Sequence, residues 1–211
     1  MNAWTTLGLL TPEILVLVTA LIVLTLDMVW RDRRRPWLPF LALAGTVLAM
    51  AATAAIYGCT ESILSEMMAV DDFALFFKLV ALGATALVIL GARCHIAQRA
   101  RREGEFYFLL LSATLASMLA TAATDLISLY LAFEFLSLAS YVLVTYLRGD
   151  DLSVEGGIKY FLYGAVASAI MLYGMSLLYG AAGTTTLHGI AAALTVGGGP
   201  LSALAIPTSI M

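Results

Sequence analysis

The sequence has 211 residues, of which 62% are hydrophobic and 12% are charged, and its mean hydropathy is +0.96. Soluble domains are typically about 45–50% apolar and about 25% charged, so this composition excludes a water-soluble globule. The formal net charge of −3 is small and gives no reason to expect nucleic acid as a partner. We therefore expect an integral membrane protein with the lipid bilayer around it.

Apolar runs long enough to cross a membrane recur along the chain, since a helix needs roughly 20 residues to span a hydrocarbon core of about 30 Å. The expected helices cover residues 10–30, 37–57, 73–92, 106–123, 126–147 and 156–179. The first run exceeds a signal-peptide core of roughly 7–15 residues, so we expect it to be retained.

Glycines and threonines between residues 180 and 200 predict a loop on the outer face. A seventh apolar stretch begins near residue 201 and rises only about 15 Å before residue 211. The sequence thus predicts an all-α membrane protein: one transmembrane domain over residues 1–211, with about six transmembrane helices and the start of a seventh.

Basic residues gather in alternate connections between these helices. The connections that carry them hold Arg31, Arg33, Arg34 and Arg35; Arg93, Arg99, Arg101 and Arg102; and Arg148 with Lys159. The other connections hold acidic residues or no basic residue. Because basic loops stay in the cytoplasm, we expect a multi-pass protein with its N-terminus outside.

Metal and cofactor ligands are not expected in this chain. Cys59 and Cys94 are expected near opposite membrane faces, where no disulfide could join them. The sequence has no Cys-x-x-Cys or His-x-x-x-His spacing and no glycine-rich phosphate loop. Redox or nucleotide chemistry would then belong to another chain.

Glu134 is the strongest candidate for a functional residue. It lies nine residues after Asp125, about 13 Å below the outer surface and near the bilayer midplane. A polar stripe runs along its helix through Tyr130, Glu134, Ser137, Tyr141 and Thr145. Such a stripe must face protein or water. A structural carboxyl would only hydrogen-bond to a neighbouring helix, and a glutamine would do so at lower cost, which favours a functional role.

Two lysines at membrane depth have more than one interpretation. Lys159, about one turn inside the cytoplasmic end of the sixth helix, either extends its ammonium to water or acts with Tyr163 on the same helix face. Nearby Gly156, Gly157 and Gly164 would let another helix approach closely. Lys78 could form a structural ion pair with Asp71 or with Glu13.

Four segments carry a resemblance to a known family. They are TPEILVL (11–17), DDFALFFKLV (71–80), DLISLYLAFEFLSLASYVLVTYLR (125–148) and VEGGIKYFLYGAVASAIMLYGMSLLYG (154–180). This sequence resembles subunit N of bacterial NADH-quinone oxidoreductase, respiratory complex I, among the antiporter-like membrane subunits. The fifth-helix glutamate followed by the Lys-Tyr-Phe-Leu start of the sixth helix is characteristic of that family.

The resemblance implies the N-terminal half of an antiporter-like fold and a role in proton translocation. In the family an essential fifth-helix glutamate, here Glu134, biases a lysine on a broken seventh helix, and Lys159 matches a lysine near the cytoplasmic proton path. The chain would be a non-redox subunit of a bacterial inner-membrane complex, with other membrane-arm subunits as partners. NADH, FMN, iron–sulfur clusters and quinone would reside in partner subunits.

Two alternatives remain open from the sequence. The tail after residue 200 holds no ionisable side chain, so the seventh-helix lysine has no counterpart, and we expect a fragment or a second chain that supplies the rest. The chain could instead belong to an Mrp-type cation/proton antiporter or a membrane-bound hydrogenase. It could also be a structural scaffold that moves no protons.

Overall fold

The computed structural model describes residues 3–30, 37–58, 61–63, 67–99, 102–147 and 149–195. The elements in chain order are α1 (Ala3–Leu9), α2 (Thr11–Val29), α3 (Leu38–Ala55), β1 (Glu61–Ile63), β2 (Met68–Val70), α4 (Asp72–Arg99), α5 (Glu103–Ala122), α6 (Leu126–Val144), α7 (Asp151–Ala182) and α8 (Leu187–Thr195). Helices α2 to α7 are the described helices with the length and apolar composition to cross a membrane. The expected helical membrane fold with about six spans is confirmed. The expected start of a seventh span, near residue 201, lies outside the described residues.

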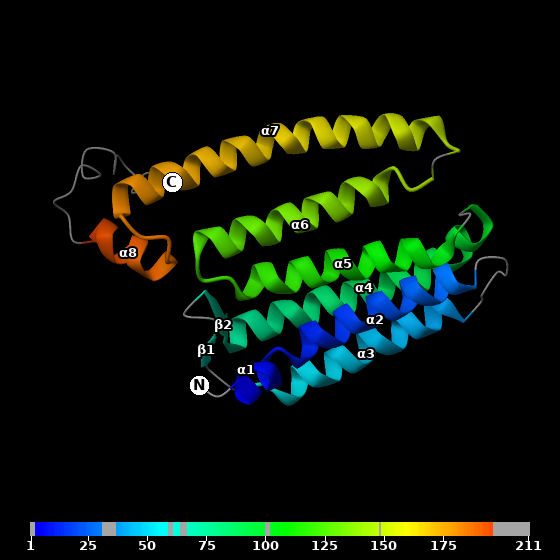
Figure 1. Cartoon of the computed structure of the whole chain (residues 1–211), viewed down its shortest axis with the longest axis horizontal. Helices are drawn as coiled ribbons and strands as arrows, with labels where there is room; N and C mark the ends of the chain where they lie inside the picture. The colour runs from blue at the N-terminus through cyan, green and yellow to red at the C-terminus, as the bar shows by residue number, and fades with distance from the viewer. Residues whose placement is uncertain are drawn as a thin grey trace.

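Helices α2, α3, α4 and α5 form a bundle, and α6 and α7 are added to it in succession (Figure 1). Helix α5 contacts α2, α3 and α4, and its remaining side packs against α6. Helix α6 in turn packs against α7. The hairpin and α8 lie at one end of the molecule, and the C-terminal ends of α2, α4 and α6 lie at the other (Figure 1).

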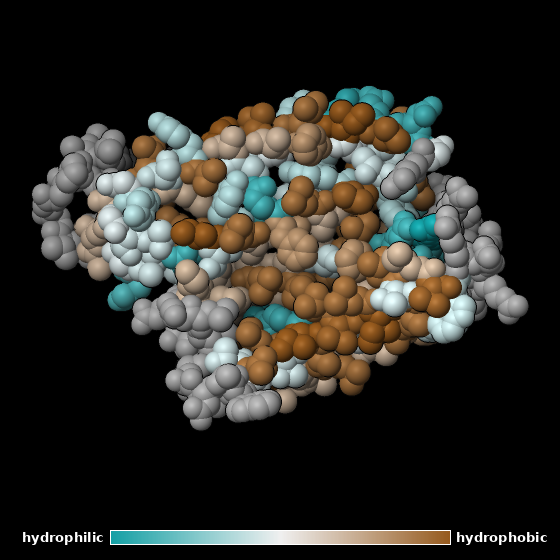
Figure 2. Space-filling model, in the orientation of Figure 1, coloured by the Kyte–Doolittle hydropathy of each residue, from teal (hydrophilic) through white to brown (hydrophobic). Residues whose placement is uncertain are grey.

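The core of the bundle follows from the spacing of apolar residues. Buried side chains recur every three or four residues on each helix, which places them on one face. They include Val16, Ala20 and Val23 of α2, Leu38, Ala42 and Ala49 of α3, Leu82 and Ile89 of α4, and Tyr107, Leu111, Leu115 and Met118 of α5. The outward faces are apolar as well, and Figure 2 shows hydrophobic side chains along α2 and α3. Helices apolar on all sides are typical of membrane spans.

Two elements differ from the sequence-based expectation. A short antiparallel hairpin pairs β1 with β2 before α4, and its strands are too short to produce a readable alternation. Residues 180–200 were expected to form a loop, but α8 begins at Leu187. There the backbone N–H of Gly189 donates to the Thr186 hydroxyl at 3.3 Å. This capping, followed by an alanine run, favours a helix despite the flanking glycines.

Helix boundaries differ where charged residues continue a helix beyond the apolar run. Helix α7 starts at Asp151, not near residue 156, because Asp150 caps it by accepting from the backbone N–H of Leu152 at 3.1 Å. Helix α4 continues to Arg99, past the expected end at residue 92. Hydropathy does not register such extensions, since their side chains are polar. At 32 residues, α7 is about 48 Å long and exceeds the hydrocarbon thickness.

Backbone hydrogen bonds join three distant segments at the α8 end of the molecule. The N–H of Thr124, between α5 and α6, donates to the carbonyl of Met67 at 3.0 Å. The N–H of Leu126 donates to Thr185, and the N–H of Leu187 donates back to Thr124, both at 2.9 Å. The α5–α6 connection is therefore held between the hairpin and the α7–α8 connection.

Gly45 lets α3 approach α2 closely. A Cβ added at Gly45 would lie 2.7 Å from the Cβ of Thr19 on α2, which neither helix could avoid without moving. Gly83 on α4 has nothing within 4 Å of the same position. Both glycines lie inside membrane spans, but only Gly45 is closely packed against another helix.

We predict that Gly45→Ala lowers the thermal unfolding midpoint of the detergent-solubilised protein, because overpacking costs about 1–3 kcal/mol. Gly83→Ala is the matched control. It should keep or raise the midpoint, since alanine in a helix is favoured over glycine by about 0.5–1 kcal/mol. Equal shifts for the two variants would show that the α2–α3 contact is not closely packed.

Candidate functional site

Glu134 lies on α6 and is half-buried. The start of α6 is fixed by Asp125, whose carboxylate accepts from the backbone N–H of Ile127 at 2.8 Å and of Ser128 at 3.4 Å. One turn before Glu134, the Tyr130 phenol is close enough to interact with the carboxyl group. The other feature of the site is Oε1 of Glu134, which is buried and makes no hydrogen bond to any described residue. A buried acceptor of this kind is costly unless water, a proton or a cation reaches it.

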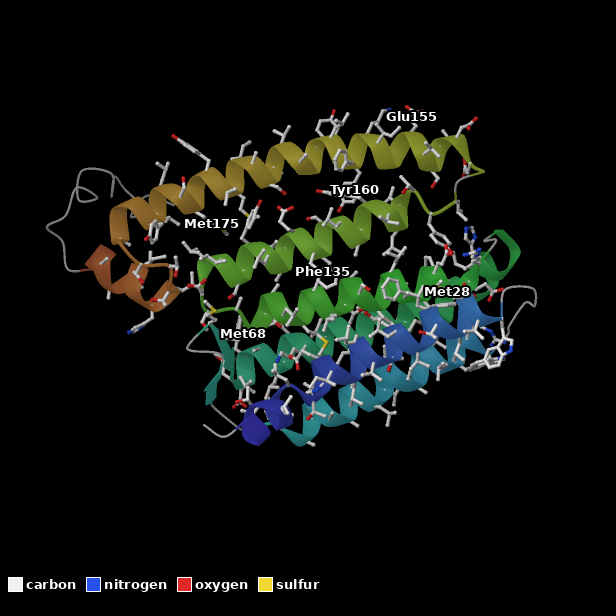
Figure 3. All side chains as sticks on the ribbon, in the orientation of Figure 1. Met28, Met68, Phe135, Glu155, Tyr160 and Met175 are labelled. Atoms are coloured by element: carbon white, nitrogen blue, oxygen red, sulfur yellow. The ribbon has the colours of Figure 1, made fainter. Side chains whose placement is uncertain are left out.

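Further along the polar stripe of α6, beyond Glu134, the side chain of Tyr141 contacts α7. The ring of Tyr141 packs edge-on against Tyr160 and Phe161 of α7, with centroid separations of 5.0 and 5.6 Å. The hydroxyl of Ser140 also donates to the Tyr160 hydroxyl at 3.2 Å. Tyr160 lies between the two helices (Figure 3). Ser137 on the stripe is half-buried, and its backbone carbonyl accepts from the Ser140 hydroxyl.

Two glycines of α7 make this helix contact possible, as the sequence led us to expect. A Cβ at Gly164 would collide with the Tyr141 hydroxyl, and a Cβ at Gly157 would collide with Thr145. Gly156, by contrast, has nothing within 4 Å and does not contribute. Tyr141 and Thr145 belong to the same stripe as Glu134, so this face of α6 is turned to α7 and not to lipid.

Lys159 and Tyr163 are not brought together with Glu134. Lys159 follows Gly157 by two positions, or 200° around the helix at 100° per residue, so it points away from α6. Its ammonium pairs with Glu155 at 2.5 Å, and the two side chains are 64% and 60% exposed. Glu155 lies on the side of α7 remote from α6 (Figure 3), and Tyr163 is 77% exposed.

Lys159 lies deeper in its helix than expected, and its ion-pair partner Glu155 was not predicted. Because α7 begins at Asp151, Lys159 is its ninth residue, more than two turns from the start instead of one. Glu155 was not singled out from the sequence. Its spacing of four residues from Lys159 is the signal that could have found it, since such pairs meet on a helix surface.

Lys78 forms an ion pair with Glu13, and Asp71 has a different role. Lys78 Nζ lies 2.6 Å from Glu13 Oε1, with the side chains only 1% and 6% exposed. The pair joins α4 to α2 inside the bundle. Asp71 instead accepts from the backbone N–H of Ala74 at 2.7 Å and so caps the start of α4. In the part of the chain that the structure describes, no group of three or more His, Cys, Asp or Glu side chains is placed to hold a metal ion.

A second charged contact lies at the opposite end of the bundle. Arg102, just before α5, pairs with Glu105 at 2.7 Å. The hydrogen bond and the charge of Glu105, with a smaller effect from Asp27, raise the pKa of the Arg102 guanidinium above its ordinary value. The Tyr146 hydroxyl donates to the Arg102 carbonyl, which ties the end of α6 to the start of α5.

We predict that Glu13→Gln strongly destabilises the protein, because it leaves the Lys78 ammonium buried without its counter-charge. Losing one partner of a buried pair costs about 3–5 kcal/mol. The double variant Glu13→Met/Lys78→Met should recover most of the loss, since apolar side chains of similar size fill the space. Thermal unfolding of the detergent-solubilised protein measures both. A double variant as unstable as the single one would rule out an unpaired charge as the cause.

Comparison with known proteins adds to this geometry. Residues 123–211 match the family described as "NADH:quinone oxidoreductase/Mrp antiporter, TM". NADH-quinone oxidoreductase subunit N of Trichlorobacter lovleyi is 36% identical over 193 residues, which cover 92% of this chain and 40% of that protein. The chain therefore spans about two fifths of the length of this relative.

Two solved structures share the fold. A chain of respiratory complex I from Thermus thermophilus superposes with a TM-score of 0.70 at 28% identity, covering 88% of this chain and 42% of that chain. A chain of the Mrp complex from Dietzia sp. DQ12-45-1b gives a TM-score of 0.67 at 18% identity, covering 86% of this chain and 20% of that chain, and shows the fold alone. The resemblance to subunit N is confirmed: most of the chain is similar to that subunit, and residues 123–211 match the NADH:quinone oxidoreductase/Mrp antiporter family.

Proposed function

We propose that this chain supplies the Glu134 part of a proton-translocating membrane-arm subunit of a bacterial NADH-quinone oxidoreductase. The protein would be a non-redox component of the complex, located in the inner membrane with other membrane-arm subunits as neighbours. NADH, FMN, iron–sulfur clusters and quinone would be bound by partner subunits. The similarity to subunit N supports the assignment, and the buried oxygen of Glu134 is the observation that carries the mechanism.

The chemistry proposed for Glu134 is the exchange of a proton or of a counter-charge. At membrane depth its carboxyl group is tolerated when it is neutral or when a cation compensates its charge. Two unit charges about 6 Å apart interact by roughly 3 kcal/mol at an effective dielectric constant of about 20. A cation that approached or left this carboxyl group would therefore change the energy of its charged form by a similar amount.

Lys159 would act at a separate step on the cytoplasmic side of Glu134. The contact of Gly157 with Thr145 places this part of α7 beside the end of α6, two turns or more from Glu134. Lys159 also faces away from α6, so direct transfer between the two residues is not proposed. Water or another cationic side chain would connect them. Glu155 holds the Lys159 ammonium on that outward face.

A second candidate is an antiporter subunit of Mrp type. The description of the matching family includes Mrp antiporters, and the Mrp complex from Dietzia shares the fold. Identification of the subunits that co-purify with the full-length protein distinguishes the two, because dehydrogenase subunits would accompany only the oxidoreductase. The third alternative is a purely structural scaffold that moves no protons. Such a protein would not need Glu134 to carry or exchange a charge.

We predict that Glu134→Gln, in the full-length protein within its complex, leaves assembly intact and reduces NADH-driven proton pumping at least tenfold. Glutamine keeps the size and hydrogen bonding of the side chain but cannot take up and release a proton. Glu134→Asp should retain part of the activity. Quenching of a pH-sensitive dye in inverted membrane vesicles measures pumping, and a native gel measures assembly.

Glu105→Gln is the matched control for that experiment, because it makes the same chemical change in an ion pair at the end of the bundle. It should pump at the wild-type rate. Wild-type pumping by Glu134→Gln as well would favour the scaffold.

We also predict the orientation in the membrane. In a protein with Cys59 and Cys94 replaced by serine, Gly149→Cys between α6 and α7 should react with a membrane-impermeant maleimide only from the cytoplasmic side. Leu187→Cys, at the start of α8, should react only from outside. Both positions are exposed. The reverse pattern would place the N-terminus in the cytoplasm.

A further inference from the structure

Arg93 lies on α4 at the end of the bundle where α2 ends and where α3 and α5 begin. Its guanidinium carbon is 4.4 Å from the centre of the Phe40 ring on α3. The apolar part of α4 ends at Arg93, whereas the helix itself continues to Arg99. The guanidinium therefore lies where a membrane span meets the layer of lipid headgroups.

Arg93 differs from its neighbour Arg102 in its charge compensation. The Arg93 guanidinium lies over the Phe40 ring, and it forms no ion pair with a carboxylate of the described residues. Arg102 at the same end is already paired with Glu105. The N–H groups of a guanidinium lie in its own plane and point outward, so a ring against one face leaves them available to oxygen acceptors such as phosphate.

The surface around Arg93 continues into the membrane as exposed apolar side chains. Leu90 and Leu87, one and two turns deeper on α4, are 56% and 72% exposed. On α3, Trp37 precedes Phe40 by three positions and shares its helix face, and both are exposed. A charged group at headgroup level thus lies directly above a surface suited to hydrocarbon.

The sequence that flanks α3 and α4 is basic. The residues that connect α2 to α3 include four arginines, and Arg99 and Arg101 follow Arg93 before α5. Within residues 27–35 and 93–105 there are eight arginines against four acidic residues, Asp27, Asp32, Glu103 and Glu105. Basic clusters beside membrane spans attract anionic lipids.

We propose that Arg93, stacked on Phe40 and beside Trp37, binds the phosphate of an anionic phospholipid whose acyl chains lie along Leu90 and Leu87. The ligand is amphiphilic, because the charged site and the apolar surface are continuous. A free phosphate ion would use only the guanidinium. This site lies on α3 and α4, apart from the Glu134 stripe of α6, and does not depend on the proposed proton transfer.

The test uses the full-length protein in its complex, reconstituted in nanodiscs of phosphatidylcholine that contain a photoactivatable phosphatidylglycerol. Mass spectrometry should find the cross-linked lipid on the peptides that carry residues 37–40 and 87–93. Arg93→Gln should lower this labelling about fivefold, the factor that corresponds to about 1 kcal/mol for one basic residue at an anionic surface. Phe40→Leu should lower it less, because it removes the ring that orients the guanidinium but keeps the charge.

Arg102→Gln is the matched control, with the same loss of charge at the same end of the bundle, and it should leave the labelling unchanged. Arg93→Lys, which keeps the charge, guards against a folding defect and should retain most of the labelling. An equal loss in Arg93→Gln and Arg102→Gln would reduce the effect to overall surface charge and overturn the site. So would unchanged labelling in Arg93→Gln, equal labelling by photoactivatable phosphatidylcholine, or protection by inorganic phosphate. Cross-links from these residues to a neighbouring subunit in place of lipid would also overturn it.

Discussion

Polar side chains at membrane depth need hydrogen-bond or charge partners within the protein. The arrangement of the bundle depends on this pairing. Glu13 and Lys78 neutralise each other between α2 and α4. The hydroxyls of Thr85 and Thr114 are 2.7 Å apart between α4 and α5, and Thr46 and Thr53 donate to carbonyls of their own helix. These contacts account for polar side chains of α2 to α5 without any exposure to lipid. Glu134 Oε1, on α6, is buried and makes no hydrogen bond to the described residues; unlike Glu13, which also has a buried oxygen without a hydrogen bond, Glu134 forms no ion pair with them.

The helices of the bundle are packed on more sides than the outer helix α7. Helix α5 lies against α2, α3, α4 and α6, whereas α7 touches α6 and α8. Of the described residues of α7, only Gly157 is buried. Yet α7 carries Glu155, Lys159 and Tyr163 on its outward face, and charged side chains inside hydrocarbon are expensive. We therefore expect these side chains to meet water or neighbouring protein in the membrane.

The spans could be located from the sequence, because hydropathy and length are local properties. The partner of Lys78 could not be chosen, since Asp71 is near in sequence while Glu13 becomes near only when α2 and α4 pack together. The direction of Lys159 was available in principle, because its angle from Gly157 and Gly164 follows from helix geometry alone. Helix α8 was not predicted, because the glycines in this segment indicated a loop. The cap at Thr186 and the three alanines favour a helix more strongly than those glycines disfavour it. The resemblance suggested a role for Glu134. The surroundings of its buried oxygen could not be predicted, because they depend on how distant segments pack together.

The backbone hydrogen bonds around Thr124 bear on the order in which the protein is assembled. As the chain emerges from the ribosome, α5 and α6 are complete before Thr185 and Leu187 exist, so the amide of Leu126 has to wait for its acceptor. The α5–α6 connection can bond to Met67 early, but its two bonds to the α7–α8 connection form only after α7 has been made. Contacts between such distant residues form late, because the loop between them must close first. In the finished protein the same amides should exchange with deuterium slowly and together, which would make this junction a marker of complete insertion.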